Sequence, residues 1–410
     1  MSGRRTKLRR APVTVIVAGA LVALAAWPVY LGARVQDSAS PVAALTPAPV
    51  KPDWRVRDAN IAFLESRAGR TRGDMLIPRL LSAEYLQRYR ERGDLGDVLR
   101  AEHVARLSLA ALPRRNIGGD VALASALLTL HRFREAKASI LDARRSEPGN
   151  VGLAAEGASL DLELGNVEGA RRLVGAHRDD PAFDVVAARL DEETGRLAAA
   201  RLRLDDAMRR ADAIYDTPAE RRAWFHARAA ELAFAAGDHE GARRAAQDGL
   251  AIFAGHLRAL TILARVDLAD RKYAEAEDAA KRAAAIQPNP EVLGMLADAQ
   301  AAHGDAAAAA ATGDQLFAVA KIGAAQHVDD RLLAVYEADH RVRVDDAYAI
   351  AKRELSVRDD VYAEDTLAWA AARSGRWHVA RKAIARALRY GIEDPRIRAH
   401  AVEIAAHPSG

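Results

Sequence analysis

Residues 263–288 read LARVDLADRKYAEAEDAAKRAAAIQP, and this stretch decides the fold class. Small residues stand at Ala264 and Ala276, on either side of a polar turn, so two helices can approach each other closely. Pro288 ends the second helix, because proline lacks an N–H group and clashes with the turn before it. The stretch predicts a helix pair. Abundant Ala, with only 5% aromatic residues, favours an all-α chain.

The same pattern recurs along the chain. Phe133-Arg134-Glu135-Ala136 corresponds to Tyr273-Ala274-Glu275-Ala276 and to Trp377-His378-Val379-Ala380. We take the last Ala of this motif as a marker, and successive markers are on average about 35 residues apart, as in repeats built from helix pairs. The markers are Ala101, Ala136, Ala170, Ala200, Ala242, Ala276, Ala309, Ala347 and Ala380.

Two other positions recur with the markers. A small residue stands twelve positions before most of them, where it lets the two helices approach: Ala124, Ala158, Ala188, Ala230, Ala264, Ala297 and Ala368. A glycine stands five positions before several markers, where left-handed backbone ends the first helix: Gly165, Gly195, Gly237, Gly304 and Gly375. Proline follows the second helix at Pro113, Pro148 and Pro288.

These residues resemble the tetratricopeptide repeat (TPR) family of bacterial type, most clearly in Leu123-Ala124…Phe133…Ala136…Ile140…Ala143…Pro148. Leu367-Ala368…Gly375…Trp377…Ala380 is another good copy. The resemblance covers residues 74–394 and implies an all-α superhelix, a solenoid of stacked antiparallel helix pairs with about nine units. The units around Ala200, Ala309 and Ala347 match the motif weakly.

The ends of the array and its longest interval predict further elements. We expect an N-terminal helix within residues 53–73 and a capping helix and tail in residues 395–410. The 42 residues between Ala200 and Ala242 predict a long second helix from Leu197 to about Ile214. After it, Thr217-Pro218-Ala219-Glu220 predicts a capping box, in which Thr217 and Glu220 bond to backbone N–H groups at the helix start.

The N-terminal residues predict a membrane-targeting segment. Residues 1–10 form a basic tail, and residues 11–33 are an uncharged apolar run long enough to cross a bilayer. Five basic residues before the run, against Arg34 directly after it, predict a cytoplasmic N-terminus and a body in the periplasm or outside the cell. Residues 34–52 are a Pro/Ser/Ala-rich linker. We expect a single-pass inner-membrane protein; the alternative is a secreted or periplasmic protein after signal cleavage.

Composition and motifs exclude several functions. The formal net charge is +4, but the tail supplies five positive charges, so the rest of the chain carries −1 and does not predict nucleic-acid binding. Cys is absent, which removes thiolate metal sites and Cys nucleophiles. No phosphate-binding loop, dinucleotide fingerprint or metalloprotease motif occurs. We therefore predict no catalytic residue, metal, cofactor or small-molecule substrate.

Acidic pairs such as Asp345-Asp346 and Asp359-Asp360 are expected at helix N-termini.

The resemblance implies a scaffold or adaptor that binds a protein or peptide in the concave groove, for instance in assembling an envelope complex. The alternative is an enzyme with a site between helical repeats. By repeat register, the groove side of the first helices carries Arg90, Arg189, Glu231, Arg265, Asp298, Tyr336, Trp369 and Arg373. Trp369 and Arg373 lie on one helical face, either as an interface hot spot or with Trp369 packed between the last two units.

Overall fold

The computed structural model describes residues 53–407, apart from residues 69, 71–72 and 324–329. In this part of the chain the regular elements are 20 α-helices and one short 3-10 helix, so the predicted all-α class is confirmed. The elements are α2 (Asp53–Arg67), α3 (Leu76–Arg92), α4 (Leu95–Ala111), α5 (Ile117–Thr129), α6 (Phe133–Ser146), α7 (Val151–Glu163), α8 (Val167–Ala176), η1 (Pro181–Phe183), α9 (Asp184–Glu193), α10 (Leu197–Asp212), α11 (Ala219–Ala235), α12 (His239–Ile252), α13 (Leu257–Ala269), α14 (Tyr273–Ile286), α15 (Pro290–His303), α16 (Ala306–Gly323), α17 (Asp330–Asp339), α18 (Val344–Val357), α19 (Val361–Arg373), α20 (Trp377–Ala387) and α21 (Pro395–Ala406).

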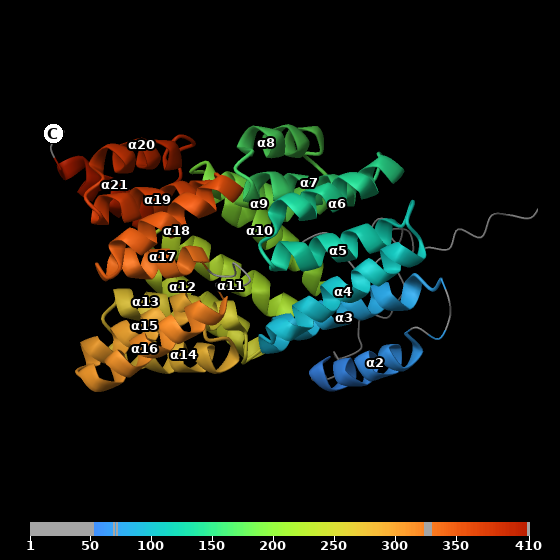
Figure 1. The fold of residues 1–410 in the computed structure, drawn as a ribbon, viewed down its shortest axis with the longest axis horizontal. Helices are drawn as coiled ribbons and strands as arrows, with labels where there is room; N and C mark the ends of the chain where they lie inside the picture. The colour runs from blue at the N-terminus through green and yellow to red at the C-terminus, as the bar shows by residue number, and fades with distance from the viewer. Residues whose placement is uncertain (1–52, 69, 71–72, 324–329, 408–410) are drawn as a thin grey trace, which may run out of the picture.

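The helices stack as antiparallel pairs, from α3 with α4 to α19 with α20, and the single helices α2 and α21 precede and follow them (Figure 1). This confirms the predicted superhelix. With α2 and α21 counted, the array is equivalent to about ten pairs, one more than the marker count. The predicted long second helix is α10, which ends at Asp212.

The marker alanines lie where the two helices of a pair touch. All except Ala309 are fully buried, and the contact leaves no room for a larger side chain. Ala309 in α16 is half-buried. Other units begin the second helix with a large residue that anchors its first turn, as Phe133 and Val167 do in the core. In α16 this position is the exposed Ala306, so the first turn packs less closely.

The turn inside each pair uses left-handed backbone, as the glycine pattern predicts. Gly237 and Gly375 have φ of 77° and 76°, and the other predicted turn glycines also have positive φ. Units without glycine adopt the same conformation with a larger residue: His131 has φ of 57° and Arg271 has φ of 59°. A side chain with a Cβ is strained there by roughly 1–2 kcal/mol.

Substitution of Arg271 by Gly should therefore stabilise the protein. Release of the left-handed strain exceeds the extra chain entropy that glycine has when unfolded, so we expect a gain of about 0.5 kcal/mol in the free energy of unfolding by denaturant titration. Gly237→Ala is the matched reverse change, since no atom lies within 4 Å of the added Cβ, and should cost about 1 kcal/mol. If both substitutions changed the free energy of unfolding by the same amount in the same direction, the strain argument would be contradicted.

The superhelix is wound so tightly that its turns touch. A Cβ on Gly165, in the turn between α7 and α8, would lie 2.5 Å from the carbonyl oxygen of Asp359, which precedes α19. A Cβ on Gly195, between α9 and α10, would overlap the carbonyl oxygen of Gly391, between α20 and α21. Units about six apart in the sequence are thus in backbone contact. In Figure 1, α8 and α9 accordingly lie beside α19 and α20.

Side chains continue this contact line, which we call the seam. Near the N-terminal end, a Cβ on Gly93 would lie 2.5 Å from the carbonyl oxygen of Ile286. The Gln287 amide donates to the Tyr89 hydroxyl at 3.4 Å. The seam thus comprises the backbone contacts of Gly93, Gly165 and Gly195 and the side-chain contacts Tyr89–Gln287, Arg134–Ser356 and Glu163–Arg358.

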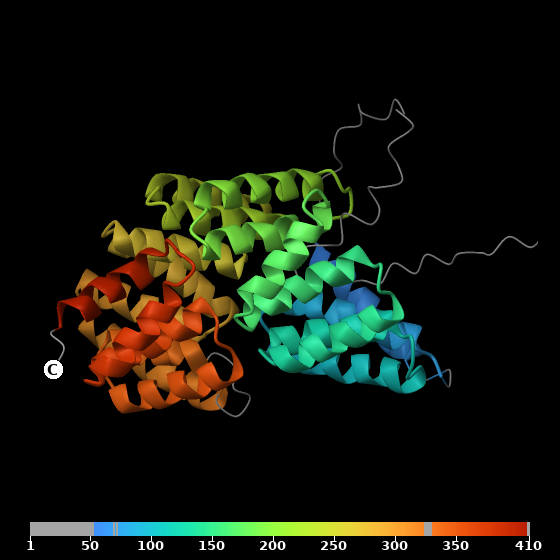
Figure 2. The same cartoon turned by 90° about the horizontal axis from the view of Figure 1, so that it is seen from above.

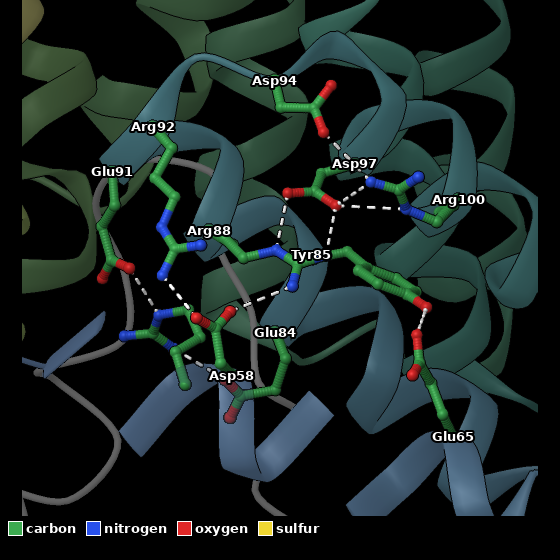
Figure 3. Close-up of polar contacts among 11 residues, drawn as sticks. Asp58, Glu65, Glu84, Tyr85, Arg88, Glu91, Arg92, Asp94, Asp97 and Arg100 are labelled. Atoms are coloured by element: carbon green, nitrogen blue, oxygen red, sulfur yellow. Dashed lines mark hydrogen bonds and ion pairs between the residues drawn. The ribbon is translucent and has the colours of Figure 1, made fainter. Parts of the chain in front are cut away.

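The helix α2 is held on the array mainly by polar contacts (Figure 3). Between residues 56 and 67, Ile61 and Leu64 are buried, whereas Val56 and Phe63 are exposed. The Asp58 carboxylate pairs with Arg88 at 3.1 Å and with Arg92 at 2.6 Å, and the Arg57 guanidinium pairs with Glu84 and Glu91 of α3. A helix attached in this way covers the apolar end of the first pair.

Candidate functional site

The first helices of the pairs form the inner layer of the superhelix. Each of several first helices packs not only on its partner but also on the next first helix, as α11 does on α13 and α17 on α19. Elements on the inside of a curve lie closer together than those outside, so these helices line the concave side. Figure 2 shows the resulting curved stack from above.

Charged and polar pairs connect successive first helices on this inner face. The His340 ring pairs with Asp298 at 2.7 Å, joining α17 to α15, and the Arg258 guanidinium lies 3.4 Å from Glu231, joining α13 to α11. We call the series the inner ladder: Glu163–Arg189, Glu192–Arg228, Glu231–Arg258, Arg265–Glu291, Asp298–His340, Asp339–Trp369 and Arg373–Glu403.

The residues predicted for the groove take part in these contacts. Arg189, Glu231, Arg265, Asp298, Trp369 and Arg373 belong to the inner ladder, and Tyr336 stacks on its His340 with ring centroids 4.1 Å apart. Arg90 lies apart from the others and pairs with Glu220 at 3.4 Å. The structure therefore places most of them along one face. That they bind a partner stays a prediction.

Trp369 is core rather than surface, with 5% of its area exposed. Its indole Nε1–H donates to Asp339 at 2.7 Å, and its ring stacks on His400 of α21 with centroids 3.9 Å apart. The Arg373 guanidinium lies over the other face, 3.7 Å from the ring centroid. Trp369 thus joins three successive first helices, which is the packing alternative of the sequence analysis.

Replacement of Trp369 by Ala should cost about 3–5 kcal/mol in the free energy of unfolding, since it removes a buried ring and leaves Asp339 without this donor. Trp377→Ala is the control, because Trp377 stacks on His407 but is only half-buried. We expect a clearly smaller loss for Trp377 in thermal and denaturant unfolding. Equal losses would mean that the α17–α19–α21 contact does not depend on Trp369.

A buried charge network lies where α9 and α11 face α19. The Arg189 Nε donates to Glu193 at 2.7 Å, and the Arg228 guanidinium bonds to Glu192 at 2.6 Å. Burial, together with the carboxylates of Glu192 and Glu193, raises the pKa of the Tyr362 phenol well above its usual value. Tyr362 comes from α19, so this network spans the interior of the superhelix.

Glu193 is the least compensated carboxyl of this network. It is fully buried, and its Oε2 has no hydrogen-bond partner. Burial raises the pKa of Glu193 to about 7, although Arg189 opposes the shift. A folded-state pKa above the unfolded value means that its contribution to stability is fully present below about pH 4.5 and is lost as the pH rises through 7.

Glu193→Gln should therefore stabilise the protein at pH 8, on the order of 1–2 kcal/mol, and change little at pH 5, where the acid is already protonated. Glu231→Gln is the control. Despite its burial, Arg258 and Arg228 lower the pKa of Glu231, so this change should destabilise the protein at pH 8. Denaturant titration at both pH values measures the two effects, and a loss at pH 8 for both variants would contradict the assignment for Glu193.

The predicted capping box at the start of α11 is wrong. Pro218 occupies the cap position, and the Thr217 hydroxyl donates to the Ala211 carbonyl oxygen at 2.8 Å instead. Glu220 is buried and accepts a hydrogen bond from Gln87 of α3 at 3.1 Å. Burial would raise the pKa of Glu220, but its hydrogen bonds and the charge of Arg90 outweigh it and hold the pKa at about 2. Long-range contact, not the local motif, sets the position of Glu220.

Sequence reasoning did not identify Arg228, Tyr362 and Arg358, which all belong to the interior. Two spacings are local signals of an ion pair: Arg228 and Glu231 are three residues apart, and Glu354 and Arg358 are four apart. The contacts of Tyr362 and Arg358 with the other half of the chain arise only through the winding of the superhelix, and no local pattern marks those contacts.

Other candidate sites are small or already satisfied. Within the residues that the structure describes, no group of three or more His, Asp or Glu is arranged to hold a metal ion. Asp360 caps α19 by accepting from the N–H groups of Tyr362 and Ala363, as expected for an acidic pair at a helix start. A cavity of about 100 Å³ between α10, α11 and α12 is smaller than the roughly 300 Å³ typical of ligand pockets. Its lining includes Arg201, Leu204 and Gly241.

The membrane prediction falls on residues 11–33, which lie outside the described part of the chain. The helices between residues 53 and 407 that the structure describes include none with the length and apolar character needed to cross a bilayer.

Comparison with solved structures identifies the fold. No family model matches the chain, and no curated protein matches it. A structure of a monomeric IFIT1 mutant with m7Gppp-AAAA is 13% identical, covers 82% of this chain and 76% of that chain, and has a TM-score of 0.51. The APC/C hetero-tetramer Cut9-Hcn1 is 14% identical over 85% of this chain, which spans just 66% of that chain, with a TM-score of 0.47.

A thermophilic TPR protein of Thermus thermophilus, TTC0263, is 20% identical, covers 45% of this chain and 100% of that chain, and has a TM-score of 0.36. These likenesses concern the fold alone. The likeness with a TM-score above 0.5 agrees with the stacked helix pairs described above.

Proposed function

We propose that the chain is a membrane-held TPR-like scaffold that binds a protein or peptide partner on its inner face. The observation that carries the proposal is the inner ladder, which repeats a charged or polar pair at each step between first helices from α7 to α21. From α13 to α17 these side chains remain accessible: the side chain of Arg265 is 40% exposed and that of Asp298 is 47% exposed. Such a strip offers donors and acceptors in regular succession to a polypeptide.

Exchange of contacts explains how a partner binds there. Partly exposed ion pairs contribute only about 0–1 kcal/mol each, because water and salt screen them. A partner's carboxylate can therefore replace Glu291 on Arg265, and a partner's amide N–H can replace His340 on Asp298, at small cost. Tyr336, whose ring edge faces Phe317, adds aromatic surface of the kind enriched in interfaces.

The membrane attachment in this proposal is supported by residues 11–33, whose uncharged run follows a basic tail. The body then lies on the far side of the inner membrane, where it would bring together components of an envelope complex. Fractionation of the full-length chain separates the alternatives. Recovery in the membrane with an intact N-terminus supports an anchor, whereas a mature chain that begins after residue 33 indicates a cleaved signal.

Site-specific photo-crosslinking tests the binding face. A photoreactive residue at Arg265 or Asp298 of the full-length chain should yield a discrete crosslinked protein band in cells. The same residue at Leu202 or Arg244, which are exposed on the second helices α10 and α12, should not. Bands from the outer positions, or from none of the four, would contradict binding on the inner face.

A further inference from the structure

The inner face between α7–α11 and α19 is occupied by the protein itself. Arg189 bonds to Glu163 and Glu193, and Arg228 bonds to Glu192 and Glu231, so their guanidinium groups are engaged within the chain. These side chains keep little exposed area although all of them lie on the concave side. A polypeptide cannot reach this part of the inner face while the turns of the superhelix overlap.

The seam that causes this overlap is polar and narrow. The Arg134 guanidinium donates to the carbonyl oxygen of Ser356 at 2.7 Å, and the Arg358 guanidinium lies 3.4 Å from Glu163. Arg358 also stacks over the Phe133 ring, 4.7 Å from its centroid. The Arg358–Glu163 ion pair is largely buried and recovers little more than the cost of its desolvation, and the Arg134–Ser356 hydrogen bond is exposed to water.

One half-buried aromatic side chain also crosses the seam, since Tyr390 packs against the apolar cluster of α7 to α9. The other contacts of the seam are polar, so the seam closes the superhelix without the large apolar contact that would make closure permanent.

Backbone approach at the seam depends on glycine. At the same position of the repeat, Gly165 and Gly195 meet backbone atoms of the opposite turn, whereas Gly237 and Gly375 face open space. All four have φ between 75° and 77°, so left-handed strain on substitution is the same. Besides adopting left-handed backbone, Gly165 and Gly195 allow the turns of the superhelix to touch, which Gly237 and Gly375 do not.

We propose that the seam is a gate: it opens to admit the partner to the inner face between α7–α11 and α19, and closes the scaffold when no partner is bound. This inference rests on the proposed function for its partner, but the opening itself is a property of the chain. The gate predicts that both open and closed forms are accessible, and that holding the seam shut prevents binding.

The absence of Cys from the chain makes a direct test possible. In the full-length protein, Ala138→Cys, one turn along α6 from Arg134, and Ser356→Cys place one label on each side of the seam, at two exposed positions that leave the seam contacts in place. Distance measurement by electron spin resonance should give a short distance for this pair. Adding Gly165→Ala and Gly195→Ala should shift a large part of the population to a longer distance. Adding Gly237→Ala and Gly375→Ala should not, even if the melting temperature falls equally. A distance unchanged by the seam substitutions overturns the proposal.

Locking the seam tests its role in binding. A short bis-maleimide crosslink between the same two cysteines should reduce photo-crosslinking of the partner from Glu231, within the closed region, by at least tenfold. The same double variant without crosslinker should bind as the parent does. If the locked protein captures the partner at Glu231 as well as the unlocked one, the gate is wrong while the scaffold proposal stands. If the unlocked protein yields no band from any inner position, the scaffold proposal fails, and the distance measurement still decides whether the seam opens.

Discussion

The close approach of two helices at a buried alanine is the contact on which the rest of this structure depends. At Ala101, Ala136 or Ala276 the side chain is fully covered, and a larger one would separate the helices. Each pair then exposes an apolar edge that only the next pair can cover, so the pairs must stack. The stack curves because the first helices pack on one another more closely than the second helices do.

Curvature determines the chemistry of the concave side. First helices that lie close together bring their side chains within ion-pair distance, which produces the inner ladder. The pairs differ along the array: those of α13 to α17 are partly exposed, whereas those of α7 to α11 lie in the interior opposite α19. In that interior, burial raises the pKa of Glu193, and Arg189 opposes the shift only in part.

The winding adds a constraint that a straight stack would lack. Because units about six apart touch, side chains such as Tyr362 and Glu220 receive partners from distant helices. The closed form is assembled mainly from glycine-mediated backbone contacts and charged side chains, to which Tyr390 adds one apolar contact with α7 to α9. A scaffold with this construction can combine a rigid repeat with a polar closure whose free energy is small.

The sequence by itself determined the repeat. Helix packing at the marker alanines and left-handed backbone at Gly237 are local requirements, each met by a residue type at a fixed spacing, so they were predictable residue by residue. Where a local element was missing, as at Ala306 in α16, the prediction was weak and the packing is looser. The capping box at Thr217 and Glu220 had the right residue types, but a long-range contact took Glu220 away from it.

Only the tertiary structure decided how tightly the array is wound. Small rotations between successive pairs accumulate over six units, and no single spacing in the sequence encodes their sum. That sum brings Gly195 against Gly391 and places Arg358 beside Glu163. It also decides which concave side chains remain accessible, and buries Trp369 between α17 and α21. The repeat register in the sequence predicts which residues lie on the concave side. The winding of the superhelix determines which other residues they contact there.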